Sequence, residues 1–236
     1  MRRSLRVAWA ALSGVVVESL LLGVAMAPSV LLLRALGWST ASLLLIGPAY
    51  LLSAVCFMVL SAGAMRLLGW RSPPDATLRI ADMAWPLLDW ARYLASTHLV
   101  RLLVGGVLRA TPLWSWYLRL NGARIGRSVF VNSLQVVDHN LLVLEEGVVI
   151  GSGAHVSGHT VEGGVVKTGS VTLGHNVTIG VGAVVGIDVA IGAGTQIGAL
   201  SLVPKHSRLP AQAVYAGIPV QRLDAHRERR LTFVAT

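Results

Sequence analysis

The chain has 236 residues, of which 54% are hydrophobic and only 13% are charged. This composition is too apolar for an ordinary soluble domain, in which about 25% of the residues are charged. The net charge of +9 comes with no nucleic-acid-binding motif, and anionic lipid headgroups explain it at least as well as nucleic acid does. The single cysteine, Cys56, excludes a disulfide framework and a thiolate metal cluster.

Two long apolar stretches lie near the N-terminus. The first runs from Arg6 to Arg34 and contains one charge, Glu18, whereas the second runs from Arg34 to Arg66 and contains none. About 20 apolar residues cross a bilayer as a helix, so both stretches are long enough. A signal peptide is the alternative for the first stretch, but its length and the second stretch behind it favour a membrane hairpin. We therefore predict two transmembrane helices within residues 1–71, at about 7–33 and 38–65.

Arginines at the ends of these stretches predict the orientation of the hairpin. Six of them flank its outer ends, namely Arg2, Arg3, Arg6, Arg66, Arg71 and Arg79. Only Arg34 lies in the turn, so the positive-inside rule places both termini in the cytoplasm, beneath the inner membrane. Glu18 is either a substrate contact within the membrane or a helix-packing contact. We favour packing, because an unpaired carboxylate in lipid costs a few kcal/mol.

Residues 72–120 form a connector. Pro73-Pro74 breaks the helix before it and marks a linker. From Asp82 to about Arg109 polar and apolar residues follow helical spacing, with tryptophans and tyrosines of the kind that settle at lipid headgroups. We interpret this segment as an amphipathic helix on the cytoplasmic membrane surface. The alternative is a helix that caps the open end of the next domain.

A six-residue repeat characterises residues 121–222. Near its end, an aliphatic side chain occupies every sixth position and a glycine follows five of the six. These aliphatic residues are Leu173, Ile179, Val185, Ile191, Ile197 and Val203. The same spacing appears upstream at Ile125, Val131 and Val137, and again at Leu144, Ile150 and Val156.

A period of six predicts a triangular solenoid in which each hexapeptide forms one short strand and one corner. Aliphatic side chains point inward, and successive coils stack at the strand spacing of about 4.8 Å. A glycine follows because a Cβ would crowd the tight corner. We therefore predict an all-β, parallel β-helix, preceded by the transmembrane hairpin and the amphipathic helix, and followed by a basic tail at 223–236.

The repeat is interrupted between Val156 and Leu173, which lie 17 residues apart, one short of three hexapeptides. Solenoids accommodate insertions as loops that leave one edge, and loops on rigid scaffolds often have functional roles. The chain departs directly after His159. An imidazole titrates near neutral pH and suits a general base that takes the proton of an attacking hydroxyl or amine. The alternative is a surface histidine at the root of a loop, while Glu162 in the loop is a candidate to orient the imidazole or bind an amine.

Gly158-His159 before the excursion, then Val171–Gly180 and Ala216–Pro219, resemble the galactoside, maltose and xenobiotic O-acetyltransferases over about residues 125–222. The resemblance implies a left-handed β-helix, a homotrimer with sites between neighbouring subunits, and His159 as the general base. It also implies that Asp138 contacts the substrate one coil earlier.

The same resemblance implies that coenzyme A binds along a groove that includes Ala199, Lys205 and Arg222. Basic groups there meet the phosphates of the cofactor. Leu200 and Pro204 depart from the family pattern, which has glycine and threonine at these positions. A phosphopantetheine-bound acyl donor would make these nucleotide contacts dispensable.

A second resemblance covers more of the chain. Ala110–Trp114, Tyr117–Gly126 and Gly198–Val203 resemble the membrane-embedded C-terminal modules of ε-poly-lysine synthetase and related non-ribosomal peptide synthetase-like enzymes. Tandem modules there join a carrier-bound amino acid to an acceptor amine. This chain has one copy, so the resemblance implies a separate carrier protein or adenylating synthetase as partner.

Together these features predict a membrane-anchored acyltransferase that uses a thioester donor and no metal. One rival is a non-catalytic membrane scaffold for a synthetase. Another is a zinc carbonic anhydrase of the β-helix type, for which His139 and His175 lie 36 residues apart but Gly180 stands where a further ligand belongs. His155 and His175 are then more simply exposed corner residues. The acceptor remains open among a sugar, a lipid-linked glycan and an amino-acid amine.

Overall fold

The computed structural model describes residues 3–37 and 39–223, which divide into two compact units. One unit comprises the chain up to Arg71 together with Arg79–Val107, and the other comprises Ser72–Leu78 and the chain from Leu108 onward. The predicted basic tail, 223–236, lies outside the described residues except for its first residue.

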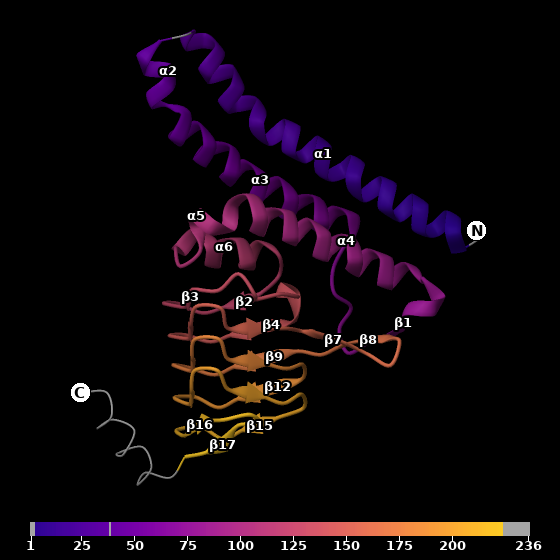
Figure 1. Ribbon diagram of the computed structural model, residues 1–236, viewed down its shortest axis with the longest axis vertical. Helices are drawn as coiled ribbons and strands as arrows, with labels where there is room; N and C mark the ends of the chain where they lie inside the picture. The colour runs from indigo at the N-terminus through magenta and orange to yellow at the C-terminus, as the bar shows by residue number, and fades with distance from the viewer. Residues whose placement is uncertain (1–2, 38, 224–236) are drawn as a thin grey trace. The chain divides into compact units, whose positions relative to one another are not determined.

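The first unit is helical (Figure 1). Its elements are α1 (Arg3–Leu36), α2 (Thr40–Leu44), α3 (Ile46–Leu68), η1 (Ile80–Asp82), α4 (Trp85–Val100) and η2 (Arg101–Gly105), after which α5 (Gly106–Leu108) leads into the second unit. Within the described residues α1 and α3 are the two helices long and apolar enough to cross a membrane, a test of length and composition that a signal sequence or a core helix also passes. They cover the two apolar stretches of the sequence.

Serine hydroxyls bridge the helices of this unit. Ser29 of α1 donates to the carbonyl of Ala49 in α3 at 2.7 Å, and Ser61 of α3 lies 2.9 Å from Ser96 of α4. These hydrogen bonds join α1 to α3 and α3 to α4. The interpretation of Glu18 as a helix-packing contact stays a prediction.

The single helix expected from Asp82 to Arg109 is interrupted. Helix α4 begins at Trp85, where Pro86 fits the first turn because that turn needs no backbone N–H donor. After Val100 the backbone widens into the five-residue π-helix η2 before α5. The glycine pair Gly105-Gly106 lowers the helical propensity of the chain at this point.

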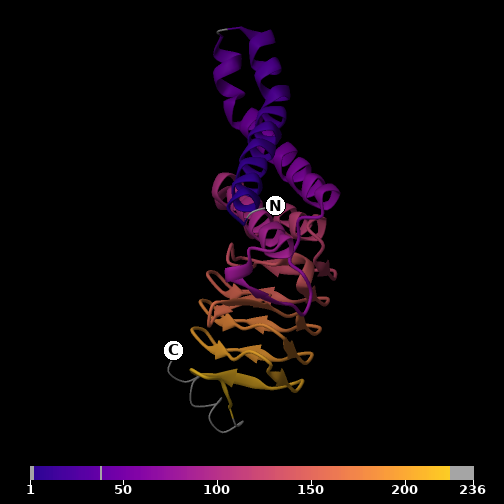
Figure 2. The same ribbon diagram turned by 90° about the vertical axis from the view of Figure 1, so that its right-hand side faces the viewer.

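The second unit is a parallel β-helix whose coils stack one above another (Figures 1 and 2). A five-stranded sheet has the order β15-β12-β9-β4-β2, a six-stranded sheet the order β17-β16-β13-β10-β5-β3, and a three-stranded sheet the order β14-β11-β6. The strands are β2 (Arg124–Ile125), β3 (Phe130–Val131), β4 (Leu142–Leu144), β5 (Val149–Ile150), β6 (His155–Val156), β9 (Val171–Leu173), β10 (Thr178–Ile179), β11 (Val184–Val185), β12 (Val189–Ile191), β13 (Gln196–Ile197), β14 (Leu202–Val203), β15 (Arg208–Leu209), β16 (Val214–Ala216) and β17 (Gln221–Arg222).

The repeat of six residues appears in the strand register. Ile179 pairs with Ile197 and Val185 with Val203, so each coil from the third onward contains 18 residues. We number the coils one to five by their inward residues in the five-stranded sheet, which are Ile125, Leu144, Leu173, Ile191 and Leu209. The predicted inward positions from Leu144 to Val203 are at most 2% exposed, which makes them the core.

Corner glycines are needed because the next coil passes very close. A Cβ on Gly180 would lie 2.5 Å from the backbone nitrogen of Ala199, and one on Gly192 would lie 2.5 Å from that of Ala211. Such contacts force the backbone to move. The glycines after the aliphatic positions therefore allow coils to stack at strand spacing.

The interruption after Val156 is an antiparallel hairpin, not an irregular loop. Strand β7 (His159–Glu162) pairs with β8 (Val165–Thr168) around a two-residue turn, Gly163-Gly164, with φ values of +56° and +74°. Positive φ at both positions is the requirement of a type I′ turn, and a Gly-Gly dipeptide is a sequence signal for it. The hairpin lengthens the step from Ile150 to its partner Ile179 to 29 residues, one coil of 18 plus 11 extra.

The first coil ends irregularly too. Val136, rather than the expected Val137, bridges to Val156, and the 3-10 turn η3 (His139–Leu141) follows. Helix α6 (Pro112–Leu120) packs its Trp114 and Tyr117 against this end of the solenoid, with Trp114 Nε1 3.2 Å from the Ser133 carbonyl. A helical cap, α6, therefore covers the first coil.

Candidate active site

The two departures from the six-residue repeat lie at the same corner of successive coils. One is the turn that begins at Asp138 in the first coil, and the other is the hairpin that begins at His159 in the second. Both fall where the chain leaves the face of the solenoid that contains the sheet β14-β11-β6 and enters the five-stranded sheet. Stacking therefore brings together side chains that are 21 residues apart in the sequence. We call this the dyad corner.

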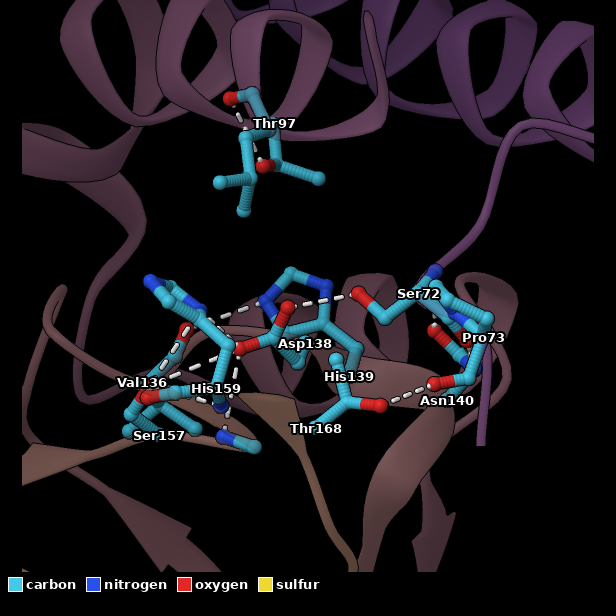
Figure 3. Close-up of polar contacts among 12 residues, drawn as sticks. Ser72, Pro73, Thr97, Val136, Asp138, His139, Asn140, Ser157, His159 and Thr168 are labelled. Atoms are coloured by element: carbon cyan, nitrogen blue, oxygen red, sulfur yellow. Dashed lines mark hydrogen bonds and ion pairs between the residues drawn. The ribbon is translucent and has the colours of Figure 1, made fainter. Parts of the chain in front are cut away.

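Asp138 and His159 form a close pair (Figure 3). His159 Nδ1 lies 2.5 Å from Asp138 Oδ2, and the Asp138 side chain is fully buried while that of His159 is 21% exposed. Because an ionised carboxylate only accepts hydrogen bonds, this contact places the imidazole proton on Nδ1. The second ring nitrogen, Nε2, is then the basic one.

Local backbone geometry presents the Asp138 carboxylate to the next coil. Asp138 has a φ of +55°, a left-handed conformation that aspartate tolerates better than most residues. The backbone N–H of Gly158 donates to Oδ2 at 3.1 Å. A Cβ at position 158 would lie 2.9 Å from the Asp138 Cβ, so glycine is required for the approach. The Gly158-His159 motif thus combines a close-approach glycine with the imidazole.

Ser157 completes the ring of contacts on this side. Its hydroxyl lies 3.3 Å from His159 Nδ1 and 3.5 Å from Asp138 Oδ2, and it donates to the His159 carbonyl at 2.9 Å. These contacts hold the imidazole by its Nδ1 edge. A histidine fixed in one tautomer, with Nε2 as the acceptor, is suited to general-base chemistry.

Glu162 lies on the hairpin but points away from His159 along the strand alternation. Its carboxylate binds Lys167 Nζ at 2.7 Å and Lys205 Nζ at 2.6 Å. Hydrogen bonds from Lys167, and then from Lys205, lower the pKa of Glu162 to about 2. The structure therefore places this residue in an ion cluster that joins the hairpin to the fourth coil, on the face of β7 opposite to that of the imidazole.

The three expected donor contacts lie on different parts of the solenoid surface. Ala199 is exposed at a corner of the fourth coil, next to Leu200, which has a φ of +56°. Lys205 is exposed but already paired with Glu162. Arg222 is exposed in β17, which pairs antiparallel with β16. Their role toward a donor stays a prediction.

A second aspartate–histidine pair lies further along the dyad corner. Asp188 of the third coil binds His206 Nδ1 at 2.8 Å and Arg208 at 2.5 Å. Hydrogen bonds from His206 and Arg208 lower the pKa of Asp188. All three side chains are more than a third exposed, so this is a surface ion cluster rather than a buried dyad.

The two histidines of the carbonic anhydrase alternative lie beyond opposite ends of two neighbouring parallel strands, β4 and β9. His139 precedes β4 and is buried against the edge of Tyr117, with Nε2 3.0 Å from the Val136 carbonyl. His175 follows β9, is exposed, and pairs with Glu145 at 3.1 Å. The 11 extra residues of the hairpin explain why a spacing of 36 does not stack them. Within residues 3–37 and 39–223, no group of three or more His, Cys, Asp or Glu side chains is placed to hold a metal ion.

Comparison with known proteins returned no matching family model and no matching curated protein. Among solved structures, the chain is similar to a hexapeptide-repeat acetyltransferase from Vibrio cholerae, with 17% identity over 72% of this chain and 91% of that one, at a TM-score of 0.43. It is also similar to a maltose O-acetyltransferase from Clostridium difficile 630, with 21% identity over 44% and 59%, at 0.37.

A serine acetyltransferase from Brucella abortus strain S19 has 17% identity over 72% of this chain and 56% of that one, at a TM-score of 0.40. In the first three structures matched, the alignment spans only 52–60% of the other chain. These neighbours are hexapeptide-repeat acyltransferases. At such identities and TM-scores these likenesses carry no argument about this chain.

Proposed function

We propose that this chain is a membrane-anchored acyltransferase that moves an acyl or aminoacyl group from a thioester to a hydroxyl or an amine. The observation behind the proposal is the Asp138–His159 pair at 2.5 Å, built where the repeat is interrupted. A buried carboxylate that fixes a partly exposed imidazole in one tautomer is the arrangement a general base requires.

In the proposed reaction the acceptor O–H or N–H attacks the thioester carbonyl while His159 Nε2 takes its proton. The Nδ1 proton stays on the imidazole, and the Asp138 carboxylate stabilises the imidazolium that forms. The tetrahedral intermediate then breaks its carbon–sulfur bond, and the departing thiolate takes the proton from Nε2. The imidazole returns to its starting state, so no metal or oxidant enters the balance.

The donor is proposed to be a pantetheine thioester, either acyl-coenzyme A or an acyl group on a carrier protein supplied by a separate synthetase. Lys205 and Arg222 are exposed cations on the solenoid, as contacts with phosphates require. Lys205 is already paired with Glu162, so a donor phosphate would have to share or displace that partner. Competition between a donor phosphate and Glu162 for Lys205 can be tested by changing either side chain.

Membrane anchoring is proposed from the surface of the two long helices. Large apolar side chains of α1 such as Leu20 and Leu31 are 64% and 65% exposed, and Leu44 before α3 is 75% exposed. Contiguous exposed apolar surface of this kind is unfavourable in water and suits lipid. Anchoring in the cytoplasmic membrane favours a lipid-linked or exported acceptor.

Assembly as a trimer is also proposed. The outer faces of the six-stranded and three-stranded sheets expose apolar side chains, including Phe130, Val149 and Val184 at 36–45%. Solvent-facing positions of a sheet are ordinarily polar, and apolar patches mark interfaces. A strictly monomeric protein in sedimentation experiments would count against sites shared between subunits.

The test is acyl transfer by the purified full-length protein and by His159→Ala. Mass spectrometry would follow products from a panel of acyl-coenzyme A and acyl-pantetheine thioesters, each offered a sugar, a lipid-linked glycan and an amino acid. Loss of a general base lowers the rate by about 10²–10⁴-fold. Equal activity of the two proteins, or a folded wild type that transfers from no thioester, contradicts the proposal and leaves the scaffold as the better account.

A further inference from the structure

The short segment Ser72–Leu78, which we call the strap, belongs to the β-helix unit although it follows α3 in the sequence. It leads into β1 (Thr77–Arg79), which lies at the edge of the hairpin in the order β1-β8-β7 (Figure 1). The strap therefore passes over the dyad corner. Nothing in the sequence pattern marks it beyond Pro73-Pro74.

The first residue of the strap contacts the dyad. Ser72 Oγ donates to Asp138 Oδ1 at 2.5 Å, across 66 residues of sequence, and Ser72 is fully buried (Figure 3). His159 and Gly158 bind the other carboxylate oxygen, Oδ2. Both oxygens of Asp138 are thus engaged, one by the hairpin side and one by the strap.

Two further residues fix the strap in place. Asn140 accepts from the Ser72 backbone N–H at 3.2 Å and donates to the Ser72 carbonyl at 2.8 Å. Thr168, at the base of the hairpin, donates to the Pro73 carbonyl at 2.5 Å, and its backbone N–H donates to the Ala76 carbonyl at 2.9 Å. The strap is therefore attached to the first coil and to the hairpin on either side of the dyad.

A buried carboxylate needs its oxygens satisfied, because an unpaired one retains the full cost of leaving water. If the Ser72 hydroxyl is removed, Oδ1 loses a charge-assisted hydrogen bond and the carboxylate can turn about its Cβ–Cγ bond. The contact with His159 Nδ1 then loses its fixed direction. The proton of the imidazole is no longer held on one nitrogen.

We propose that Ser72 is a positioning residue for the dyad: its hydroxyl holds Asp138 in the orientation that keeps the imidazole proton of His159 on Nδ1. The effect on catalysis rests on the proposed function, whereas the effect on the imidazole does not. The segment that follows the second long apolar helix thus completes the site of the β-helix.

The test uses full-length protein with ¹⁵N-labelled histidine, and His159→Gln identifies the signals of this ring. In the wild type we expect a protonated Nδ1 and an unprotonated Nε2 above the titration of the imidazole. In Ser72→Ala the two ¹⁵N shifts should move toward each other as the tautomers mix, and Ser72→Thr, which keeps the hydroxyl, should restore the separation. Activity of Ser72→Ala should fall about tenfold in kcat with little change in KM.

Ser133→Ala is the matched control. Ser133 is also fully buried in the β-helix unit, and its hydroxyl donates to the Ala154 carbonyl at 2.7 Å, away from the dyad. It should cost comparable stability and leave the His159 shifts unchanged. Wild-type shifts in Ser72→Ala overturn the proposal, whatever the stability. If the wild type transfers no acyl group, the ¹⁵N shifts still decide whether Ser72 positions the dyad. A failure of the proposed acyl transfer can therefore be told apart from a failure of the role proposed for Ser72.

Discussion

Lys205 and Glu162 join the fourth coil of the β-helix to the hairpin, with the Lys205 ammonium 2.6 Å and 2.8 Å from the two carboxylate oxygens. Lys167, on the facing strand of the hairpin, binds the same carboxylate at 2.7 Å. One carboxylate thus serves two ammonium groups at the surface. The hairpin that begins with His159 is attached to the coils at its far end as well as at its base.

This cluster predicts a pH-dependent attachment of the hairpin. The pKa of Glu162 is about 2 in the folded protein, against an ordinary value of 4.5. A depressed pKa contributes stability that is present above about pH 4.5 and is lost as the pH falls toward 2. Hydrogen exchange of the hairpin amides, corrected for intrinsic rates, should show protection decreasing through that window.

Glu162→Gln should remove this dependence and lower hairpin protection at neutral pH as well. Glu146→Gln, at an exposed carboxylate of the second coil, is the control and should behave like the wild type. Unchanged protection in Glu162→Gln would show that the cluster does not hold the hairpin.

Lys205 also offers a way to identify the donor. If it binds a phosphate of coenzyme A, Lys205→Ala should raise KM about tenfold for acyl-coenzyme A, and leave KM for an acyl-pantetheine without the nucleotide unchanged. Glu162→Gln should lower KM for acyl-coenzyme A, since Lys205 would lose a competing carboxylate. Equal effects of Lys205→Ala on both donors would restrict this lysine to attaching the hairpin.

Asp138→Asn should reduce kcat by about 10²-fold or more, because the amide can present a donor to Nδ1 and stabilise the wrong tautomer. The negative charge that stabilises the protonated imidazole is also lost. Asp188→Asn is the matched control at the same corner, since Asp188 also pairs with a histidine but at the surface. Loss of activity in both variants alike would contradict a special role of Asp138.

The regular part of the fold was predictable from the spacing of its residues. The inward positions from Leu173 to Val203 follow from a period of six, because identical spacing must stack when each coil contains three hexapeptides. Where the six-residue period is interrupted, counting residues no longer predicts which side chains point inward. Val136 replaces Val137 in the first coil, and the step after Val156 contains a hairpin that the Gly163-Gly164 dipeptide signals. The handedness of the coils stays a prediction.

The site was predictable only in part, for a physical reason. Stacking made it predictable that Asp138 could lie near His159, since residues at one corner of neighbouring coils are close. The contact of Asp138 with a substrate, which the resemblance implies, stays a prediction. The positions of Ser72 and Asn140 were not predictable, because the strap reaches the corner through long-range contacts that no periodicity encodes. The expectation that Glu162 orients the imidazole ignored alternation along a strand, which turns its side chain away from that of His159. Its alternative role, binding an amine, stays a prediction.

Two glycine substitutions distinguish the stability cost of steric overlap with the next coil from the cost of an unfavourable backbone conformation. Gly180→Ala places a Cβ 2.5 Å from the backbone of the next coil, so it should destabilise the β-helix by about 1–3 kcal/mol or more. Gly153→Ala meets nothing within 4 Å, but its φ of +66° costs an alanine about 1–2 kcal/mol. Gly153→Asn, which tolerates that conformation better, should recover part of the loss, whereas Gly180→Asn should not. Chemical unfolding measures all four variants.

The proposed membrane orientation makes a labelling prediction. Cys56 is the only cysteine, so a Cys56→Ser background permits single reporters. Thr40→Cys, exposed at the start of the short helix α2 between the two long helices, should react in intact cells with a thiol reagent that does not cross membranes. Val181→Cys, 56% exposed on the β-helix, should react only after the cells are opened, because the arginines at the outer ends of the hairpin keep that side in the cytoplasm. The opposite pattern, with Val181→Cys labelled in intact cells and Thr40→Cys labelled only after opening, would reverse the orientation. If both were labelled only after opening, the helices would not span the membrane, and α1 and α3 would pack as core or surface helices instead.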